Sequence, residues 1–348
     1  MRSVALIWCC LLFGGLPFLA CADDVTLGTI KGDVQIRAAG SVRTRAAEPG
    51  LVLRTGDRVM TGTDGWVVLL IPDGSRVVLT AGSEFQIRSL DSSRRSGAFT
   101  LLRGMLRAVV TPSTSAPPDY RFYTRAAVAG LRGTDFALIS RDQANVYFGN
   151  NGKVEVRGVN TDARFLTAGT VVQSTRGLLP TQPILVESGS PLAEAQALIN
   201  AVTEQAPVSW IESGRLPEII ARWNVNYSRY LADAGREQEA LHVLQVALDL
   251  SDEVQIQADA HLERGAVYSR DPARVRDALE EYAILAELPL TMPQREIGIY
   301  MAGLGLQQIK QTAQARVLLE QYLREYPQGR YRERVETLLN ALVSSTVR

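Results

Sequence analysis

The chain has few of the side chains on which most enzyme chemistry depends. Its two histidines, His242 and His261, have no cysteine or second histidine at the spacing of a metal site. No Gly-x-Ser-x-Gly nucleophile turn and no glycine-rich phosphate loop before a helix occurs in the sequence. These absences exclude the common sequence patterns of hydrolases, metalloenzymes and nucleotide-binding proteins. We therefore predict a protein that is not an enzyme, with no catalytic residue, no metal ion and no cofactor.

Carboxylates are present, but not in a pattern that indicates catalysis. Asp57, Asp64 and Asp73 could serve a glycosidase, yet each lies beside a turn glycine, where aspartate is expected for structural reasons. We interpret all three as turn residues.

Cysteine is also scarce, and all three cysteines lie within the first 21 residues. This segment begins with Arg2, continues with an apolar run over Val4–Leu19, and ends in Ala20-Cys21-Ala22. Such a pattern predicts a signal peptide over residues 1–22 that is cleaved after Ala22; lipoprotein processing at Cys21 is the alternative. We expect a protein of the periplasm or cell surface, without disulfides after cleavage at Ala22.

No later segment is apolar enough to span a membrane, so we expect no membrane span after processing. Basic and acidic residues balance at 37 each, which is not the footprint of a nucleic-acid-binding protein. The balance is uneven along the chain: residues 23–178 carry 20 basic and 14 acidic side chains, and residues 179–348 carry 16 and 23. A mildly basic first half could favour an acidic glycan, although a solvated surface is the simpler explanation.

Short apolar runs recur about every ten residues over 23–178, separated by turn signals such as Asp73-Gly74 and Asn151-Gly152. This spacing predicts an all-β domain with strands arranged as a stacked, solenoid-like structure or as a sandwich. A Leu-x-x-Gly pattern recurs four times and suggests repeated corners, ending at Gly56, Gly82, Gly104 and Gly169. In the central stretch Thr124–Ile139, we expect Gly130 and Gly133 to form a kink or bulge between two buried strands.

Six short motifs over residues 28–175 occur in the order typical of the FecR-domain family, which this region resembles. They include the run Gly56–Gly62, the Asp73-Gly74-Ser75 turn and the run Leu131–Phe136. The positions that carry the resemblance as a structural motif are Gly56, Asp57, Thr61, Gly62, Asp73, Gly74, Arg132, Gly133, Thr134 and Phe136. The resemblance implies a periplasmic or cell-surface β-domain used in sensing or scaffolding. In iron-uptake regulators of the family, a cytoplasmic anti-sigma segment and a membrane span precede the domain; here about twenty residues do, so we do not expect a direct anti-sigma role.

Aromatic residues of the β half are expected in its core, with a glycan-stacking platform as the alternative. These residues are Trp66, Phe85, Phe99, Phe122, Phe136, Phe148 and Phe165. We expect Arg132, the charged residue of the central apolar stretch, to pair with Asp135 or another carboxylate inside the fold; a ligand role is the alternative.

Residues 179–216 are rich in proline and predict a linker with one helix that begins at Ser190-Pro191. From residue 217 the apolar period changes to 3.6, which predicts a helical-hairpin array over 217–348. This region resembles the tetratricopeptide repeat, with packing positions at Gly235, Ala240, Leu244, Ala247, Ala278, Tyr282, Gly303, Ala315, Leu319 and Pro327. A plain helical bundle is the alternative. Acidic residues here, including Glu239 and Glu281, are expected on solvated faces.

Together these features predict an exported interaction or scaffold protein of the cell envelope. The helical array would dock a protein partner, and the β-domain would contact another envelope component, such as a cell-wall glycan. Two alternatives remain: a ligand-sensing module of a signalling relay, and a polysaccharide-binding protein.

Overall fold

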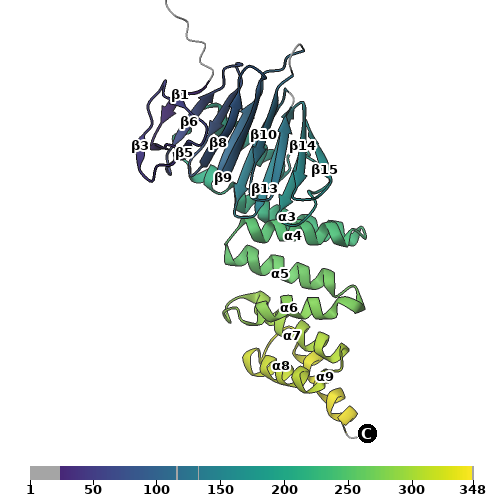
Figure 1. Cartoon of the computed structure of the whole chain (residues 1–348). Coiled ribbons are helices and arrows are strands. Elements are labelled where there is room, and N and C mark those ends of the chain that lie inside the picture. Colours follow the sequence, from purple (N-terminus) through teal and green to yellow (C-terminus); the bar gives the residue numbers. More distant parts are fainter. Residues whose placement is uncertain (1–23, 115–116, 132, 347–348) are drawn as a thin grey trace, which may run out of the picture.

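The computed structural model describes residues 24–114, 117–131 and 133–346. The predicted signal peptide, with Ala22 and Cys21, lies outside the described residues. Within them, seventeen strands are followed by nine α-helices, and the later helices form a column that leads away from the β-region to the C-terminus (Figure 1). The predicted class, a β-domain followed by a helical-hairpin array, is confirmed. Within these ranges, no helix is long and apolar enough to cross a membrane.

The strands form one open sheet that folds into two facing layers. The first layer contains, in order, β4 (Val52–Leu53), β1 (Val25–Lys31), β6 (Trp66–Leu70), β7 (Arg76–Leu79), the second half of β9 (Ser96–Val109), β12 (Asp135–Arg141), β13 (Ala144–Asn151), β16 (Thr170–Thr175) and β17 (Ile184–Leu185). The second layer contains β3 (Thr44–Ala46), β2 (Val34–Arg37), β5 (Arg58–Thr61), β8 (Glu84–Asp91), the first half of β9, β10 (Asp119–Tyr123), β11 (Ala127–Leu131), β14 (Lys153–Gly158) and β15 (Ala163–Thr167). Neighbouring strands are antiparallel except for β9 and β10.

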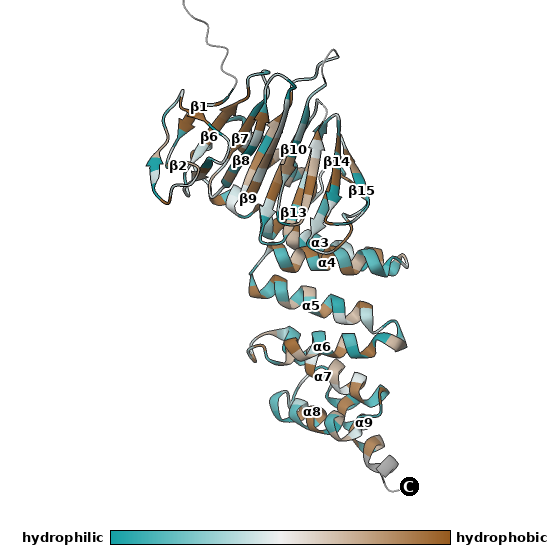
Figure 2. Ribbon diagram, viewed as in Figure 1, coloured by the Kyte–Doolittle hydropathy of each residue, from teal (hydrophilic) through white to brown (hydrophobic). Residues whose placement is uncertain are grey.

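The two layers enclose the main apolar core, which draws side chains from both. It includes a chain of aromatic contacts in which the ring centre of Phe99 lies 5.6 Å from that of Phe85 and 5.2 Å from that of Phe122. Apolar and polar residues alternate along the strands, as expected when one face of each strand is buried (Figure 2). The sandwich is therefore the observed alternative, and the predicted solenoid is not seen. Tight turns such as Asp73-Gly74 return the chain antiparallel to itself, whereas a coil would pair its turns in parallel.

The long strand β9 joins the layers by bending at Gly104. Its residues up to Arg103 pair with β8, and those from Gly104 onward pair with β7 or β12. The φ angle of Gly104 is +101°, and a Cβ atom there would lie 2.3 Å from the Ser83 hydroxyl. Only glycine fits such a bend. The four glycines of the Leu-x-x-Gly pattern all have positive φ angles, so this pattern does mark corners.

The central stretch crosses from one layer to the other. β11 belongs to the second layer and β12 to the first, and Gly133 between them has a φ angle of +67°. The predicted kink therefore lies at Gly133. The prediction was wrong for Gly130, which has an ordinary φ angle and pairs within β11.

The proline-rich segment is structured and lies against the first layer. It contains β17 and two helices, α1 (Pro191–Glu204) and the short α2 (Ile211–Gly214), where one helix was predicted. Thr181 exchanges two hydrogen bonds of 2.9 Å with the backbone of Gln173. Ser190 caps α1 through a bond from the Ala193 amide to its hydroxyl, as the sequence predicted.

The remaining helices stack so that each contacts the next. They are α3 (Leu216–Asp233), α4 (Glu237–Leu250), α5 (Val254–Tyr268), α6 (Val275–Ala286), preceded by a 3₁₀ turn over Pro272–Arg274, α7 (Pro293–Gln308), α8 (Thr312–Glu325) and α9 (Arg332–Thr346). Alternate helices also touch, α3 with α5 and α5 with α7. Of the predicted packing positions, Ala240, Leu244, Ala247, Ala278, Tyr282, Ala315 and Leu319 are buried, Gly303 packs against Leu319, and Gly235 and Pro327 lie in turns. The assignment to the tetratricopeptide repeat stays a prediction.

Helices α1, α3 and α4 cover the outer face of the first layer. Ile139, Val146 and Phe148 from this face share one continuous apolar core with helix residues such as Ile220 and Leu244. Buried polar contacts reinforce it. The side-chain amides of Gln173 and Asn224, both fully buried, bond each other reciprocally at 2.8 and 2.7 Å. The β-region and the first helices of the array are thus packed as one body.

We predict that Gly104→Ala destabilises the protein far more than Gly82→Ala. Both residues have positive φ angles, but a Cβ atom at Gly82 would meet nothing within 4 Å. Gly82→Ala should therefore cost only the backbone strain of about 1 kcal/mol. Gly104→Ala adds the clash with Ser83 and should cost about 3 kcal/mol or more. Urea unfolding of the two variants tests this, and equal losses would contradict the assigned bend.

Candidate functional site

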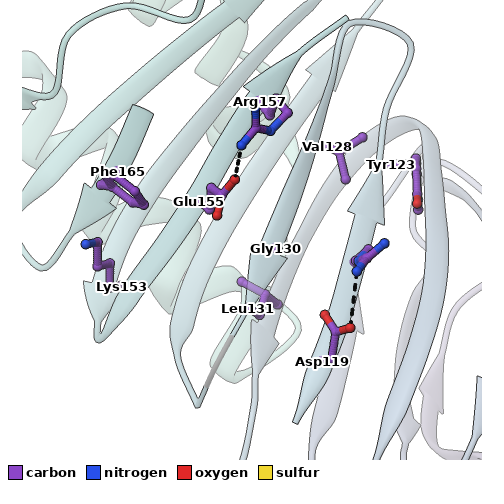
Figure 3. Close-up of a pocket in the computed structure, with 10 residues that line it drawn as sticks. Asp119, Tyr123, Val128, Gly130, Leu131, Lys153, Glu155, Arg157 and Phe165 are labelled. Atoms are coloured by element: carbon purple, nitrogen blue, oxygen red, sulfur yellow. Dashed lines mark hydrogen bonds and ion pairs between the residues drawn. The ribbon is translucent and has the colours of Figure 1, made fainter. Parts of the chain in front are cut away.

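The outer face of the second layer carries an open groove of about 700 Å³ (Figure 3). It lies over β10, β11, β14 and β15. The lining residues are Asp119, Arg121, Tyr123, Val128, Gly130, Leu131, Lys153, Glu155, Arg157 and Phe165. Most of them alternate along their strands, because every second side chain points to this face.

The groove follows β11, where the side chains are short. Arg121 and Glu155 lie opposite Gly130 on the neighbouring strands, and Tyr123 and Arg157 lie opposite Val128. A Cβ atom at Gly130 would meet only the Glu155 carbonyl oxygen, at 3.9 Å. The floor is therefore largely bare backbone between two walls of long side chains.

Charges of both signs line the walls. Arg121 pairs with Asp119 at 3.3 Å, and Arg157 pairs with Glu155 at 2.6 Å. Lys153 instead lies over the ring of Phe165, 3.7 Å from its centre, and has no carboxylate partner among the described residues. Exposed ion pairs are weak, so these side chains can exchange partners with a ligand at little cost.

The groove suits a binding function. Its walls offer guanidinium and ammonium donors, carboxylate acceptors and the aromatic ring of Phe165, which is 45% exposed. Such a surface fits a polar polymer that carries charged groups and apolar faces. Among the described residues, no group of three His, Cys, Asp or Glu side chains is placed to hold a metal ion.

Two predicted motif residues, Asp57 and Thr61, hold loops together by hydrogen bonds and are not ligands of a site. The Asp57 carboxylate accepts bonds of 2.9 Å from the backbone amides of Ala39 and Arg54. The Thr61 hydroxyl donates to the Thr80 carbonyl at 2.6 Å and accepts from the Ser83 amide at 2.7 Å. It thereby holds the corner beside the bend in β9.

The other predicted turn residues are also structural. Asp73 accepts a bond from the Ser75 amide and pairs with Arg95 at 3.0 Å, while Asp64 accepts a 3.0 Å bond from the Asp33 amide. Gly56 and Gly74 have positive φ angles in their turns, and Gly62 packs against Asp33. Asp57, Asp64 and Asp73 bond three different loops and do not converge on one site.

The run from residue 131 to residue 136 contributes to the core and to the layer crossing. Phe136 is fully buried and contacts Phe122 edge-on at 5.5 Å, and Thr134 is buried. Arg132 lies outside the described residues. Asp135 is held by Arg107 through bonds of 2.9 and 2.7 Å, an ion pair that the sequence did not indicate.

The aromatic prediction was right for six residues and wrong for one. Trp66, Phe85, Phe99, Phe122, Phe136 and Phe148 are buried, whereas Phe165 lines the groove. A signal for the groove was present in the alternation of charged residues along 119–123 and 153–157. The alternation alone did not predict a groove, because the two charged strands flank β11 only through pairing between residues far apart in the sequence.

The helical half holds a buried ionic cluster. Glu281, expected on a solvated face, is only 6% exposed and lies between His261 at 2.7 Å and Arg264 at 3.0 Å. The helix α5 supplies both partners, so Glu281 ties α6 to α5. The expectation failed because the 3.6-residue period shows a helix's own apolar face but not which polar face meets a neighbour.

Comparison with known families places the groove in a recognised domain. Residues 57–157 match a family model described as FecR protein. This range runs from the Asp57 turn to β14 and contains every groove residue except Phe165. The resemblance read from the sequence motifs is thereby confirmed for this part of the chain. No curated protein matches the chain.

Two crystal structures from Parabacteroides distasonis, each of a protein provisionally named an anti-sigma factor, are similar to the chain. The first is 17% identical to this chain, with a TM-score of 0.32. The similar region covers 37% of this chain and 60% of the crystallised chain. The second is 14% identical to this chain, with a TM-score of 0.33, and the similar region covers 42% of this chain and 73% of the crystallised chain. The chain thus spans less than two thirds of the first structure, and these similarities are too low to support a function.

Burial of His242 predicts a pH-dependent stability. Its pKa is lowered to about 4, mainly because burial disfavours the charged ring, against a smaller opposing effect of Glu239. The unfolded chain binds this proton near pH 6.5, so stability should fall as the pH drops from 6.5 towards 4. We expect His242→Gln to lose less stability than the wild type between pH 7 and 4.5, by on the order of 2 kcal/mol. Urea unfolding at both pH values measures it, and parallel losses would contradict a buried neutral ring.

Proposed function

We propose a non-catalytic binding function in the cell envelope for this chain, which carries a FecR domain over residues 57–157. The domain contacts an envelope component through the groove on its second layer, and the helical array docks a protein partner. The chain would act as a scaffold between the two.

One observation carries this proposal: the two outer faces of the sandwich differ. The face of the first layer is sealed by α1, α3 and α4 in a continuous apolar core. The face of the second layer bears an open groove with three cations and two carboxylates. A sandwich that is anchored on one side and open on the other presents a binding surface away from its support.

The chemistry of the groove favours a cell-wall glycan with acidic groups. Lys153 has no carboxylate partner in the described chain, so a ligand carboxylate would find an uncompensated charge there. The ring of Phe165 beside it offers an apolar face to a sugar. The basic excess of residues 23–178 supports the same class of ligand.

The helical array offers a separate surface for a protein. Apolar side chains are exposed on it at Ile284 in α6, Leu290 before α7 and Val317 in α8, which are 45%, 61% and 60% exposed. Stacked helical hairpins of this kind present extended surfaces to other proteins. An N-terminal signal peptide, as the sequence predicts, would place both surfaces in the periplasm or at the cell surface.

A ligand-sensing role is the second candidate, because the β-region and the array share one core. Arg141 at the end of β12 pairs with Glu218 of α3 at 2.9 Å and with Asp252 before α5 at 2.7 Å. Ligand occupancy on the sheet could therefore bias the packing of the first helices. In this case a glycan ligand would alter hydrogen exchange in α3–α5, whereas a passive scaffold would show changes only at the groove.

We predict that Gly130→Trp blocks glycan binding without harming the fold. The new side chain would occupy the floor of the groove, where a Cβ atom has free space and the φ angle is ordinary. Retention of the mature protein on purified cell-wall glycan should fall about tenfold or more. Wild-type retention should also weaken with added salt, because the contacts are ionic.

The matched control is Gly214→Trp, which adds the same side chain at an open position of α2. It should bind like the wild type and unfold at a similar temperature. If Gly130→Trp binds as well as the control, the groove is not the binding surface.

We further predict that the triple variant Ile284→Ser, Leu290→Ser, Val317→Ser loses a crosslinked protein partner while keeping glycan retention. The exposed positions make little contribution to folding, so the melting temperature should change little. Crosslinking in the cell envelope with wild type and variant measures the loss. Equal recovery of the partner by both proteins would move the docking surface away from these residues.

A further inference from the structure

A second cleft, of about 570 Å³, lies where residues 178–182 meet α4 and α5. It shares no lining side chain with the groove. Three of its lining residues are arginines: Arg164 from β15, Arg264 from α5 and Arg274 after it. The walls between them are largely apolar, with Leu178, Pro180, Leu241 and Tyr268.

Arg164 is an inward-facing charge on the edge strand of the second layer. Its neighbour Phe165 points outward to the groove, and Leu166 lies in the core. Strand alternation therefore places Arg164 on the inner side of the layer. At this edge of the sandwich its side chain lines the cleft together with residues of α4 and α5. No hydrogen bond or ion pair joins its guanidinium to the described residues, and its buried Nε atom has no partner.

The other charges around the cleft are compensated. Arg264 pairs with Glu281 at 3.0 Å, Arg274 pairs with Asp277 at 2.8 Å, and Glu239 is held by Arg236 at 2.7 Å. The charge of Arg164 is offset only by the longer-range attraction of Glu239, whose carboxylate Arg236 already holds. Arg274 also stacks on the ring of Tyr268, 4.2 Å from its centre, which fixes an aromatic face in the cleft.

Unsatisfied polar atoms gather at this one place. Arg164 Nε, Arg264 Nε and His242 Nε2 are all buried without a hydrogen-bond partner, and all three residues line the cleft. Leaving a buried donor without a partner lowers the stability of the folded protein. A ligand oxyanion towards which these side chains turn would recover that stability.

We propose that this cleft binds a small organic anion. Its carboxylate or phosphate group would be held by Arg164, with support from Arg274, and its apolar body would lie against Pro180 and Tyr268. Guanidinium groups bind both oxyanions in the same forked geometry, so the shared chemistry is an oxyanion on an apolar body. The site joins the β-region to the array and is independent of the groove.

The rival explanation is that Arg164 only protects an edge strand. Inward-pointing charges on edge strands hinder pairing with other chains. Such a guard would need no anion, and binding of an anion would not depend on it.

The test uses the mature full-length chain with two probes, 3-phenylpropanoate and phenyl phosphate, titrated calorimetrically at constant ionic strength in chloride. We expect at least one probe to bind, and its dissociation constant to rise about tenfold or more in Arg164→Gln, since a charged hydrogen bond is lost. Arg164→Lys keeps the charge but loses the forked guanidinium geometry, so its dissociation constant for the probe should lie between those of the wild type and Arg164→Gln. The probe that binds more tightly identifies the head group.

The matched control is Arg45→Gln, which removes an exposed arginine from β3 at the opposite edge of the same layer. It should bind the probe like the wild type. Because binding is measured directly on folded protein, a change in stability alone cannot imitate the result. If neither probe binds, or if Arg164→Gln binds as tightly as the control, the cleft is not an anion site and Arg164 is an edge guard only.

Discussion

The arrangement of this protein depends on the burial of one outer face of its β-sandwich beneath α1, α3 and α4. A two-layer sandwich has two outer faces, and here only the first layer is closed off by a continuous apolar core. The buried amide pair of Gln173 and Asn224 and the ion pairs of Arg141 fix the register of helices on strands. Without this contact the helical array would not be fixed to the sandwich, and the first layer would expose an apolar surface.

The same contact decides where binding surfaces can lie. The groove over β11 faces away from the helices, and the basic cleft forms at the margin where the helices meet the edge of the sandwich. The FecR match covers β10, β11 and nearly all of β14, but neither β15 nor the helices that anchor the sandwich. The family domain thus supplies the surface, and the residues beyond it orient that surface.

Local signals predicted much of the fold, and their failures share a physical cause. Most strands and helices followed from apolar period, turn residues and caps, because these depend on neighbours in sequence. The Leu-x-x-Gly pattern marked Gly104 as a corner, but not that β9 continues through it, because each half of the strand pairs with a different layer. Asp135 pairs with Arg107 of the adjacent strand β9, a long-range contact that no local signal indicated.

The sequence by itself determined the class of the protein: its β-half, the family motifs, the change of period near residue 217 and the scarcity of catalytic side chains. These properties reside in short stretches, where residue type and spacing act through local backbone preferences. Only the tertiary structure decided that Phe165 faces a groove, that Glu281 is buried and that Arg164 points inward without a partner. Strand order and helix contacts set these features, and both arise from packing between residues far apart in the chain.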